Sequence, residues 1–204
     1  MNRKTLAIVD YGFGNHSSVL HTFQSLGHRC RVTNNREILV AADLLVLPGV
    51  GAFPSAMSAL HKLGLVTFLC ELAGQGKPLI GLCLGMQLLA DKSLENGLTE
   101  GLGLIPGTVR ALPSMEWHIG WNTLENVLPD PMMASSGGES FYFNHSYFFD
   151  VPAAYQAAVS HTNECSFTVA VRRGNVLGLQ FHPEKSQAAG KQLLLSAVEG
   201  LCDA

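Results

Sequence analysis

The first half of the chain alternates short apolar runs with stretches that carry a helical spacing of apolar residues. Uninterrupted apolar runs of this length, bounded by Gly, Pro or Asp, are typical of strands buried on both faces of a sheet. The expected strands are residues 6–9, 31–33, 44–47 and 78–82, and the expected helices are residues 15–26, capped by Asn15, residues 53–63 and residues 66–74. This alternation predicts a doubly wound parallel sheet.

After residue 99 the pattern changes to strand-like segments separated by Pro and Gly. These segments are residues 104–112, 117–127, 141–151, 157–160, 166–172 and 176–181, and a last helix is expected over residues 187–198. They indicate a mixed or antiparallel extension of the sheet. The run Ser135-Ser136-Gly137-Gly138 is expected to be a flexible loop, too short to link two domains. We therefore predict a single α/β domain over residues 1–204 with a doubly wound mixed sheet.

Composition narrows the class of protein. The 204 residues are 47% hydrophobic and 14% charged, enough to bury a large core, and the net charge of -3 predicts no nucleic-acid partner. The apolar run near the N-terminus ends at Asp10, too early for a secretory signal. Five cysteines without a Cys-x-x-Cys pair favour a reducing compartment, so a cytoplasmic protein is expected. The eight histidines show no zinc spacing, and no metal is predicted.

Residues 81–85, Gly-Leu-Cys-Leu-Gly, place a cysteine between two glycines where a predicted strand gives way to helix-forming residues. Small flanking residues permit the sharp turn of a nucleophile elbow, which exposes the side chain at its tip. A helix N-terminus also favours thiolate over thiol. A buried structural cysteine would fit this segment as well, so Cys83 alone does not decide between the two.

A second motif, Gln180-Phe181-His182-Pro183-Glu184, follows the last apolar run. A thiol that attacks an amide needs a base for its proton, and that base needs a third group to orient it. His182 and Glu184 supply both groups in one loop that Pro183 stiffens. A His-x-Glu pair often arises by chance, but together with the cysteine elbow it indicates a Cys-His-Glu catalytic triad.

Two glycine-containing loops follow other predicted strands. Gly12-Phe13-Gly14 is not a dinucleotide-binding motif, because Ser17 stands where the third glycine belongs and no acidic residue follows at the ribose spacing. Gly49 and Gly51 allow two explanations. They permit either a tight turn or a loop whose backbone N–H stabilises an oxyanion.

These motifs resemble the class I, or triad, glutamine amidotransferases. Segments similar to this family are spread over nearly the whole chain: residues 8–15, 47–53, 81–88, 118–122, 141–147 and 180–186. The Pro-Gly-Val-Gly and Gly-Trp-Asn elements are closest to the glutaminase subunits of imidazole glycerol phosphate synthases. The resemblance implies a flavodoxin-like fold and no cofactor. It also implies ammonia transfer to a (β/α)8-barrel cyclase subunit as partner, in histidine biosynthesis.

The same resemblance implies roles for further residues. Backbone N–H groups of Leu84 and of the Gly49–Val50 segment would form the oxyanion hole, in a loop that moves when the cyclase binds its substrate. Gln87 and the backbone around Ser146 and Tyr147 would hold the glutamine substrate. Residues at the cyclase interface would be Trp121, Tyr142 and Lys185, although these could equally be core aromatics and a surface charge.

The chain departs from the family pattern at His16 and Asn144, which replace a usual leucine and valine. Neither belongs to the triad, but they leave the partner open. The alternatives are a related subunit that serves another synthase, such as one for surface-sugar amidination, and a stand-alone cysteine amide hydrolase. A catalytically silent module is disfavoured by the intact triad.

Overall fold

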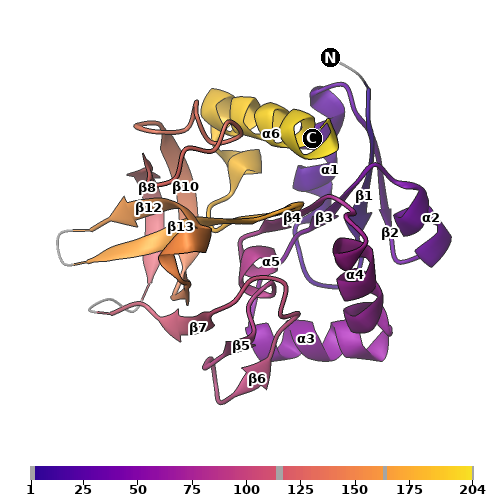
Figure 1. Cartoon of the computed structure of the whole chain (residues 1–204), viewed down its shortest axis with the longest axis horizontal. Coiled ribbons are helices and arrows are strands. Elements are labelled where there is room, and N and C mark those ends of the chain that lie inside the picture. Colours follow the sequence, from indigo (N-terminus) through magenta and orange to yellow (C-terminus); the bar gives the residue numbers. More distant parts are fainter. Residues whose placement is uncertain (1–2, 114–116, 163–164, 204) are drawn as a thin grey trace.

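The computed structural model describes residues 3–113, 117–162 and 165–203, and an eight-stranded mixed sheet runs through it (Figure 1). The strands of this sheet are, in spatial order, β2 (Arg29–Thr33), β1 (Thr5–Val9), β3 (Leu44–Leu47), β4 (Leu79–Leu82), β14 (Val176–Leu179), β13 (Ser166–Arg173), β12 (Gln156–His161) and β9 (Glu125–Asn126). The first five are parallel and the last three join by antiparallel pairing. The predicted doubly wound mixed sheet is confirmed.

Two smaller sheets complete the second half of the chain. One pairs β8 (His118–Thr123) with β10 (Ser140–His145), and the other contains β11 (Tyr147–Asp150), β7 (Thr108–Ala111), β5 (Lys92–Ser93) and β6 (Thr99–Glu100). β10 and β11 are separated only by Ser146, so the chain changes sheets at that residue. This crossing brings the small sheets beside the end of the large one.

Helices cover both faces of the large sheet because successive strand residues point to opposite sides. Leu6 and Ile8 of β1 pack in one core with α1 (His16–Ser25) and α6 (Gln187–Cys202). Ala7 and Val9 pack in the opposite core. The helices of that second core are α2 (Arg36–Ala41), α3 (Phe53–Lys62), α4 (Leu65–Gly74) and α5 (Leu84–Gln87). In the described part of the chain no single helix is long and apolar enough to cross a membrane. Helices α3 and α4 meet the length and apolarity requirement only when taken together, and the pair is bent by 89°.

Several element predictions were wrong in detail. Helix α2 was missed, as were the two-residue strands β5 and β6. The strand expected over residues 104–112 is only β7, because Pro106 and Gly107 interrupt that segment. The strands expected over 117–127 and 141–151 are each split between two sheets. Residues 135–138 form a turn held by the buried Ser136, whose hydroxyl donates to Met133 O (2.7 Å), so they are not a free loop.

Candidate active site

The ends of neighbouring parallel strands bring Cys83 and His182 together. Strands β4 and β14 pair with Leu82 opposite Leu179, and Cys83 N–H donates to the carbonyl of Leu179 (2.8 Å). His182 comes three residues after Leu179, and its own N–H donates to the carbonyl of Tyr142 in β10 (2.8 Å). Two segments that lie about a hundred residues apart in the sequence therefore meet at one edge of the sheet, where open α/β sheets bind ligands.

Cys83 sits at a strained turn between β4 and α5. Its φ of 53° lies in the left-handed region that non-glycine residues rarely adopt, as expected for a nucleophile elbow. Glycine is required at both positions next to this turn, because a side chain there would collide with neighbouring backbone atoms. A Cβ at Gly81 would lie 2.5 Å from the carbonyl oxygen of Gly85, and one at Gly85 would lie 1.8 Å from that of Leu47. Helix α5 is a single turn, so Cys83 faces the unpaired N–H groups of that turn and not a long helix dipole.

Replacing Gly85 with alanine should therefore lower the free energy of unfolding by about 3 kcal/mol or more, since the new methyl group cannot fit against β3 without moving backbone. Urea unfolding of the two proteins measures the difference. Gly74→Ala is the matched control, because a Cβ there has nothing within 4 Å. Equal stabilities for the two alanine variants would show that the elbow is not crowded.

His182 and Glu184 form a buried pair beside the cysteine. The ring nitrogen Nδ1 lies 2.8 Å from Glu184 Oε1, and the two side chains are 6% and 3% exposed. Burial on its own would lower the pKa of His182. Hydrogen bonds to Cys83 and Glu184, together with the negative charges of both, outweigh burial and raise this pKa to about 10. Glu184 Oε2 is buried without a hydrogen-bond partner among the described residues. The geometry suits a cysteine and a histidine that share one proton, with a carboxylate holding the ring.

The loop between β3 and α3 is fixed at one end and open at the other. The hydroxyl of Tyr11 donates to the carbonyl of Pro48 (2.6 Å), and Gly49 is packed so closely that a Cβ would lie 2.8 Å from both Leu84 Cβ and Tyr11 Oη. Val50, by contrast, is 44% exposed and lines the cavity beside Cys83. The Val50–Gly51 end of the loop is therefore the less tightly packed end, and Gly51 has a φ of +101°.

The backbone N–H groups of Val50 and Leu84 have no hydrogen-bond acceptor among the described residues. Both residues line the cavity, whereas Gly49 lies behind them. Two unpaired donors next to a nucleophile are what an oxyanion hole requires.

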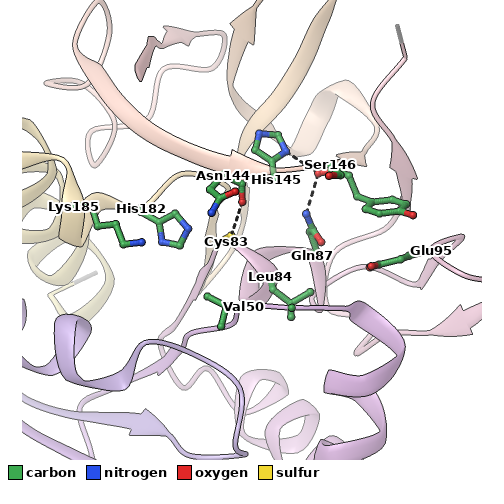
Figure 2. Close-up of a pocket in the computed structure, with 12 residues that line it drawn as sticks. Val50, Cys83, Leu84, Gln87, Glu95, Asn144, His145, Ser146, His182 and Lys185 are labelled. Carbon is green, nitrogen blue, oxygen red and sulfur yellow. Dashed lines mark hydrogen bonds between the residues drawn. The ribbon is translucent and has the colours of Figure 1, made fainter. Parts of the chain in front are cut away.

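A cavity of about 270 Å³ opens in front of Cys83 (Figure 2). Its wall includes Gln87, Ser146 and Tyr147, the three residues expected to hold a substrate. The amide nitrogen of Gln87 donates to the carbonyl of Tyr147 (2.9 Å) and to Gln180 Oε1 (3.0 Å). Gln87 is thus held rigidly toward the segment around Ser146.

Further residues lie in the cavity wall or next to Cys83, and the sequence patterns did not indicate their roles. Glu95 contributes a carboxylate that accepts from Phe53 N–H (2.9 Å), and His145 lies in the wall between Asn144 and Ser146 (Figure 2). Gln180 is fully buried, and its amide nitrogen lies 3.9 Å from Cys83 Sγ. His145 and Gln180 lie in segments that resemble the family, whereas Glu95 lies in none of them. In the described part of the chain no group of three or more His, Cys, Asp or Glu residues could hold a metal ion.

The residues expected at a partner surface lie next to the cavity. Lys185 lines it, and its Nζ stands 5.5 Å from the centre of the Tyr142 ring. Tyr142 in turn contacts the rings of Trp121 at 6.1 Å and of His182 at 6.3 Å between ring centres. Trp121 is 52% exposed. A continuous row of side chains thus leads from His182 to the surface.

A match to a family model identifies the protein family of this chain. The model for "Glutamine amidotransferase class-I" matches residues 7–198, which is nearly the whole described chain and includes Cys83, His182 and Glu184. The chain belongs to the class I glutamine amidotransferase family. The Cys-His-Glu cluster of this glutamine amidotransferase accordingly lies inside the matched region, as does every residue of the cavity wall.

Curated relatives of this amidotransferase share its length. The protein from Streptococcus sanguinis (strain SK36) is 43% identical over 193 residues, covering 93% of both chains, and the one from Streptococcus mutans is 41% identical, covering 97% of this chain and all of that one. A protein from Bacillus cytotoxicus is 44% identical, covering 93% of this chain and 91% of that one. All three are named "Imidazole glycerol phosphate synthase subunit HisH". The amidotransferase is therefore of the HisH type.

Solved structures agree on the fold. "Structure of PurLQS from Thermotoga maritima" matches with a TM-score of 0.77 at 19% identity, covering 97% of this chain and 99% of that chain. A glutamine amidotransferase from Thermotoga maritima matches with a TM-score of 0.70 at 16% identity over the full length of both. At these identities the likeness extends to the fold, and it confirms the expected flavodoxin-like α/β architecture of the amidotransferase.

Proposed function

We propose that this chain is the glutaminase subunit of imidazole glycerol phosphate synthase and that Cys83, His182 and Glu184 are its catalytic triad. The names of the relatives support the first part. The observation that carries the second is the buried His182–Glu184 pair at 2.8 Å beside Cys83, which lines the cavity. Glutamine is hydrolysed to glutamate, and the ammonia passes to a cyclase subunit.

The reaction begins when the Cys83 thiolate attacks the side-chain carboxamide carbon of glutamine. The carbonyl electrons move to its oxygen, and the N–H groups of Val50 and Leu84 stabilise the oxyanion. His182, carrying the proton it shares with Cys83, protonates the departing nitrogen. The carbon–nitrogen bond breaks, ammonia leaves, and a glutamyl thioester remains on Cys83.

Hydrolysis of the thioester reverses the roles. Neutral His182 takes a proton from water while the water oxygen attacks the thioester carbon, and the carbon–sulfur bond breaks to release glutamate. The thiolate and the protonated histidine are thereby restored. Glu184 holds the ring through Nδ1, so that the other nitrogen, Nε2, faces the sulfur, and it balances the positive charge of the imidazolium.

The cavity wall offers groups that suit glutamine as the substrate. Gln87 and the backbone around Ser146 and Tyr147 would position the substrate with its carboxamide at Cys83. Glu95 offers a negative charge that suits the α-ammonium group of an amino acid, and it is held in place by its bond to Phe53 N–H. A substrate without that ammonium group should bind less well.

An apolar face beside the cavity suits a protein partner. Trp117, Ile119 and Trp121 alternate along β8 and its approach, and all three are exposed, at 61%, 58% and 52%. Exposed apolar groups of this size mark protein interfaces. With Tyr142 and Lys185 they would meet a (β/α)8-barrel cyclase, and ammonia would leave between the two subunits. Both subunits would work in the cytoplasm.

The proposed function predicts that the chain alone hydrolyses glutamine slowly. Val50 is exposed at the less tightly packed end of its loop, so the oxyanion hole would be complete only when a liganded partner fixes it. Completing one oxyanion donor should raise the rate about 10² to 10³-fold. The measurement is glutamine hydrolysis by the chain alone, with a cyclase subunit, and with cyclase and its nucleotide ligand, the large rise being expected at the last step.

Full activity of the chain alone would contradict this proposal and favour a stand-alone hydrolase. Activation by the cyclase of a different synthase, but not by that of imidazole glycerol phosphate synthase, would favour a related subunit with another partner. A Trp121→Ala variant provides the control for docking, because it should weaken activation without changing the slow rate of the free chain.

A further inference from the structure

Two buried histidines lie directly opposite each other in the β8–β10 pair. His118 and His145 are 8% and 7% exposed, and Nδ1 of His118 lies 3.1 Å from Nε2 of His145. Neither ring takes part in the reaction steps described above. Because one of the two borders the cavity, their hydrogen bonds reach its wall.

The direction of these hydrogen bonds is fixed at the cavity end. His145 Nδ1 lies 2.9 Å from the carbonyl oxygen of Tyr147. A carbonyl oxygen can only accept, so Nδ1 of His145 must carry a hydrogen. If the ring is neutral, its Nε2 is then an acceptor, and Nδ1 of His118 must be the donor to it.

The direction is fixed independently at the other end. The amide nitrogen of Asn122 donates to the carbonyl of His161 (2.9 Å), and its oxygen accepts from Thr123 N–H (2.8 Å), so the amide cannot be reversed. That nitrogen also lies 3.3 Å from His118 Nε2 and donates to it. Nε2 of His118 is therefore an acceptor, and the proton of this ring is on Nδ1, as the cavity end requires.

The hydrogen bond from His145 to Tyr147 and the one from Asn122 to His118 are compatible only if both rings are neutral with the proton on Nδ1. Burial lowers the pKa of His118. Burial, with the nearby His118 and His182, also lowers the pKa of His145 to about 3 despite its bond to Tyr147 O, so its ring is neutral at physiological pH. A charged His145 would place two N–H donors against each other at its contact with His118.

The carbonyl of Tyr147 receives a second donor from the opposite side. Gln87 Nε2 lies 2.9 Å from the same oxygen, and Figure 2 shows the bonds from His145 and Gln87 converging beside Ser146. A carbonyl oxygen has two lone pairs, so both are used. The peptide unit at Tyr147 is therefore held from two elements, α5 and β10.

We propose that His145 is a positioning residue for glutamine binding, which His118 and Asn122 hold in its Nδ1–H form so that it and Gln87 together fix the carbonyl of Tyr147 and the cavity wall at Ser146 and Tyr147. This inference rests on the proposed role of that wall in holding glutamine. It does not depend on which partner receives the ammonia.

The isosteric pair His145→Asn and His145→Leu tests this role. Asparagine places its amide nitrogen near the position of the histidine Nδ1 and can still donate to Tyr147 O, whereas leucine fills the same space without a donor. Measured by calorimetry in a Cys83→Ala chain, so that glutamine is not consumed, the leucine change should weaken glutamine binding about tenfold relative to asparagine. The melting temperature of each variant is measured alongside, to show that it is folded.

A second measurement needs no substitution. In the unaltered chain, ¹⁵N shifts of the two rings should report Nδ1–H, neutral histidines at 118 and 145. A double-mutant cycle adds that His118→Leu should weaken glutamine binding when His145 is present and have no further effect beside His145→Leu.

Equal glutamine affinity for folded His145→Asn and His145→Leu chains would overturn the proposal, as would an Nε2–H or doubly protonated His145. Failure of the proposed catalytic function is visible separately. In that case Cys83→Ala would still hydrolyse glutamine, whatever the affinities of the His145 variants.

Discussion

Replacing Cys83 with alanine is expected to abolish synthesis from glutamine in the assembled complex and to leave synthesis from added ammonium salt intact. The thioester cannot form without the sulfur, whereas free ammonia enters the cyclase reaction without this subunit's chemistry. Both rates are measured in the same preparation with saturating nucleotide substrate. The ammonium assay shows that the cyclase is still active, and co-elution of the two subunits in size-exclusion chromatography separates loss of the nucleophile from loss of assembly.

Cys30→Ala is the matched control. Cys30 lies in β2, at the far edge of the sheet from the cavity, so the same loss of a thiol should leave synthesis from glutamine unchanged. If Cys83→Ala retained near wild-type hydrolysis of glutamine, another residue would be the nucleophile and the strained turn at position 83 would need a structural explanation.

The second large effect is expected at His182. His182→Asn should lower glutamine turnover by about 10² to 10⁴-fold, the usual contribution of a general acid–base group, since the asparagine amide cannot carry a proton to the leaving nitrogen. Glu184→Gln should be milder, because the amide oxygen can still accept from Nδ1 of His182 while stabilising the imidazolium less. Single-turnover glutamine hydrolysis in the activated complex measures both.

The chain contains its own control for this pair. His161 and Glu125 form a histidine–carboxylate contact of the same 2.8 Å length, but with side chains 54% and 65% exposed and away from the cavity. His161→Asn and Glu125→Gln should therefore leave turnover unchanged. The prediction is that His182→Asn loses more glutamine turnover than Glu184→Gln. A larger loss for Glu184→Gln, or negligible loss for both, would assign the proton transfer to another residue.

Local features of the sequence predicted much of the fold and of the site. The sequence located Cys83 and His182 near the ends of strands because a short buried apolar run precedes each residue. Both runs are strands in the parallel half of the sheet. Helix α2 was missed since it is six residues long and buries only Leu39, although Asn35 caps it by accepting from Ile38 N–H. Short elements of this kind are defined by their packing and leave little periodicity.

The contacts that depend on strand register could not be predicted. His118 and His145 meet because β8 and β10 pair with these two residues opposite each other, across 27 positions of sequence that no local pattern spans. Glu95 reaches the cavity because it follows the two-residue strand β5, which has no strand signal of its own. Such residues looked like ordinary core or surface groups until the pairing was known.

The alternation of side chains along β8 would allow the choice of cyclase partner to be changed without changing the cavity. Its odd positions, 119 and 121, point to the surface with residue 117, while the even positions 118 and 122 face inward and belong to the histidine network. Because a strand alternates strictly between its faces, the two sets can be exchanged independently. A chimera that takes only the odd positions from another synthase's subunit should change its choice of cyclase while glutamine recognition is inherited unaltered.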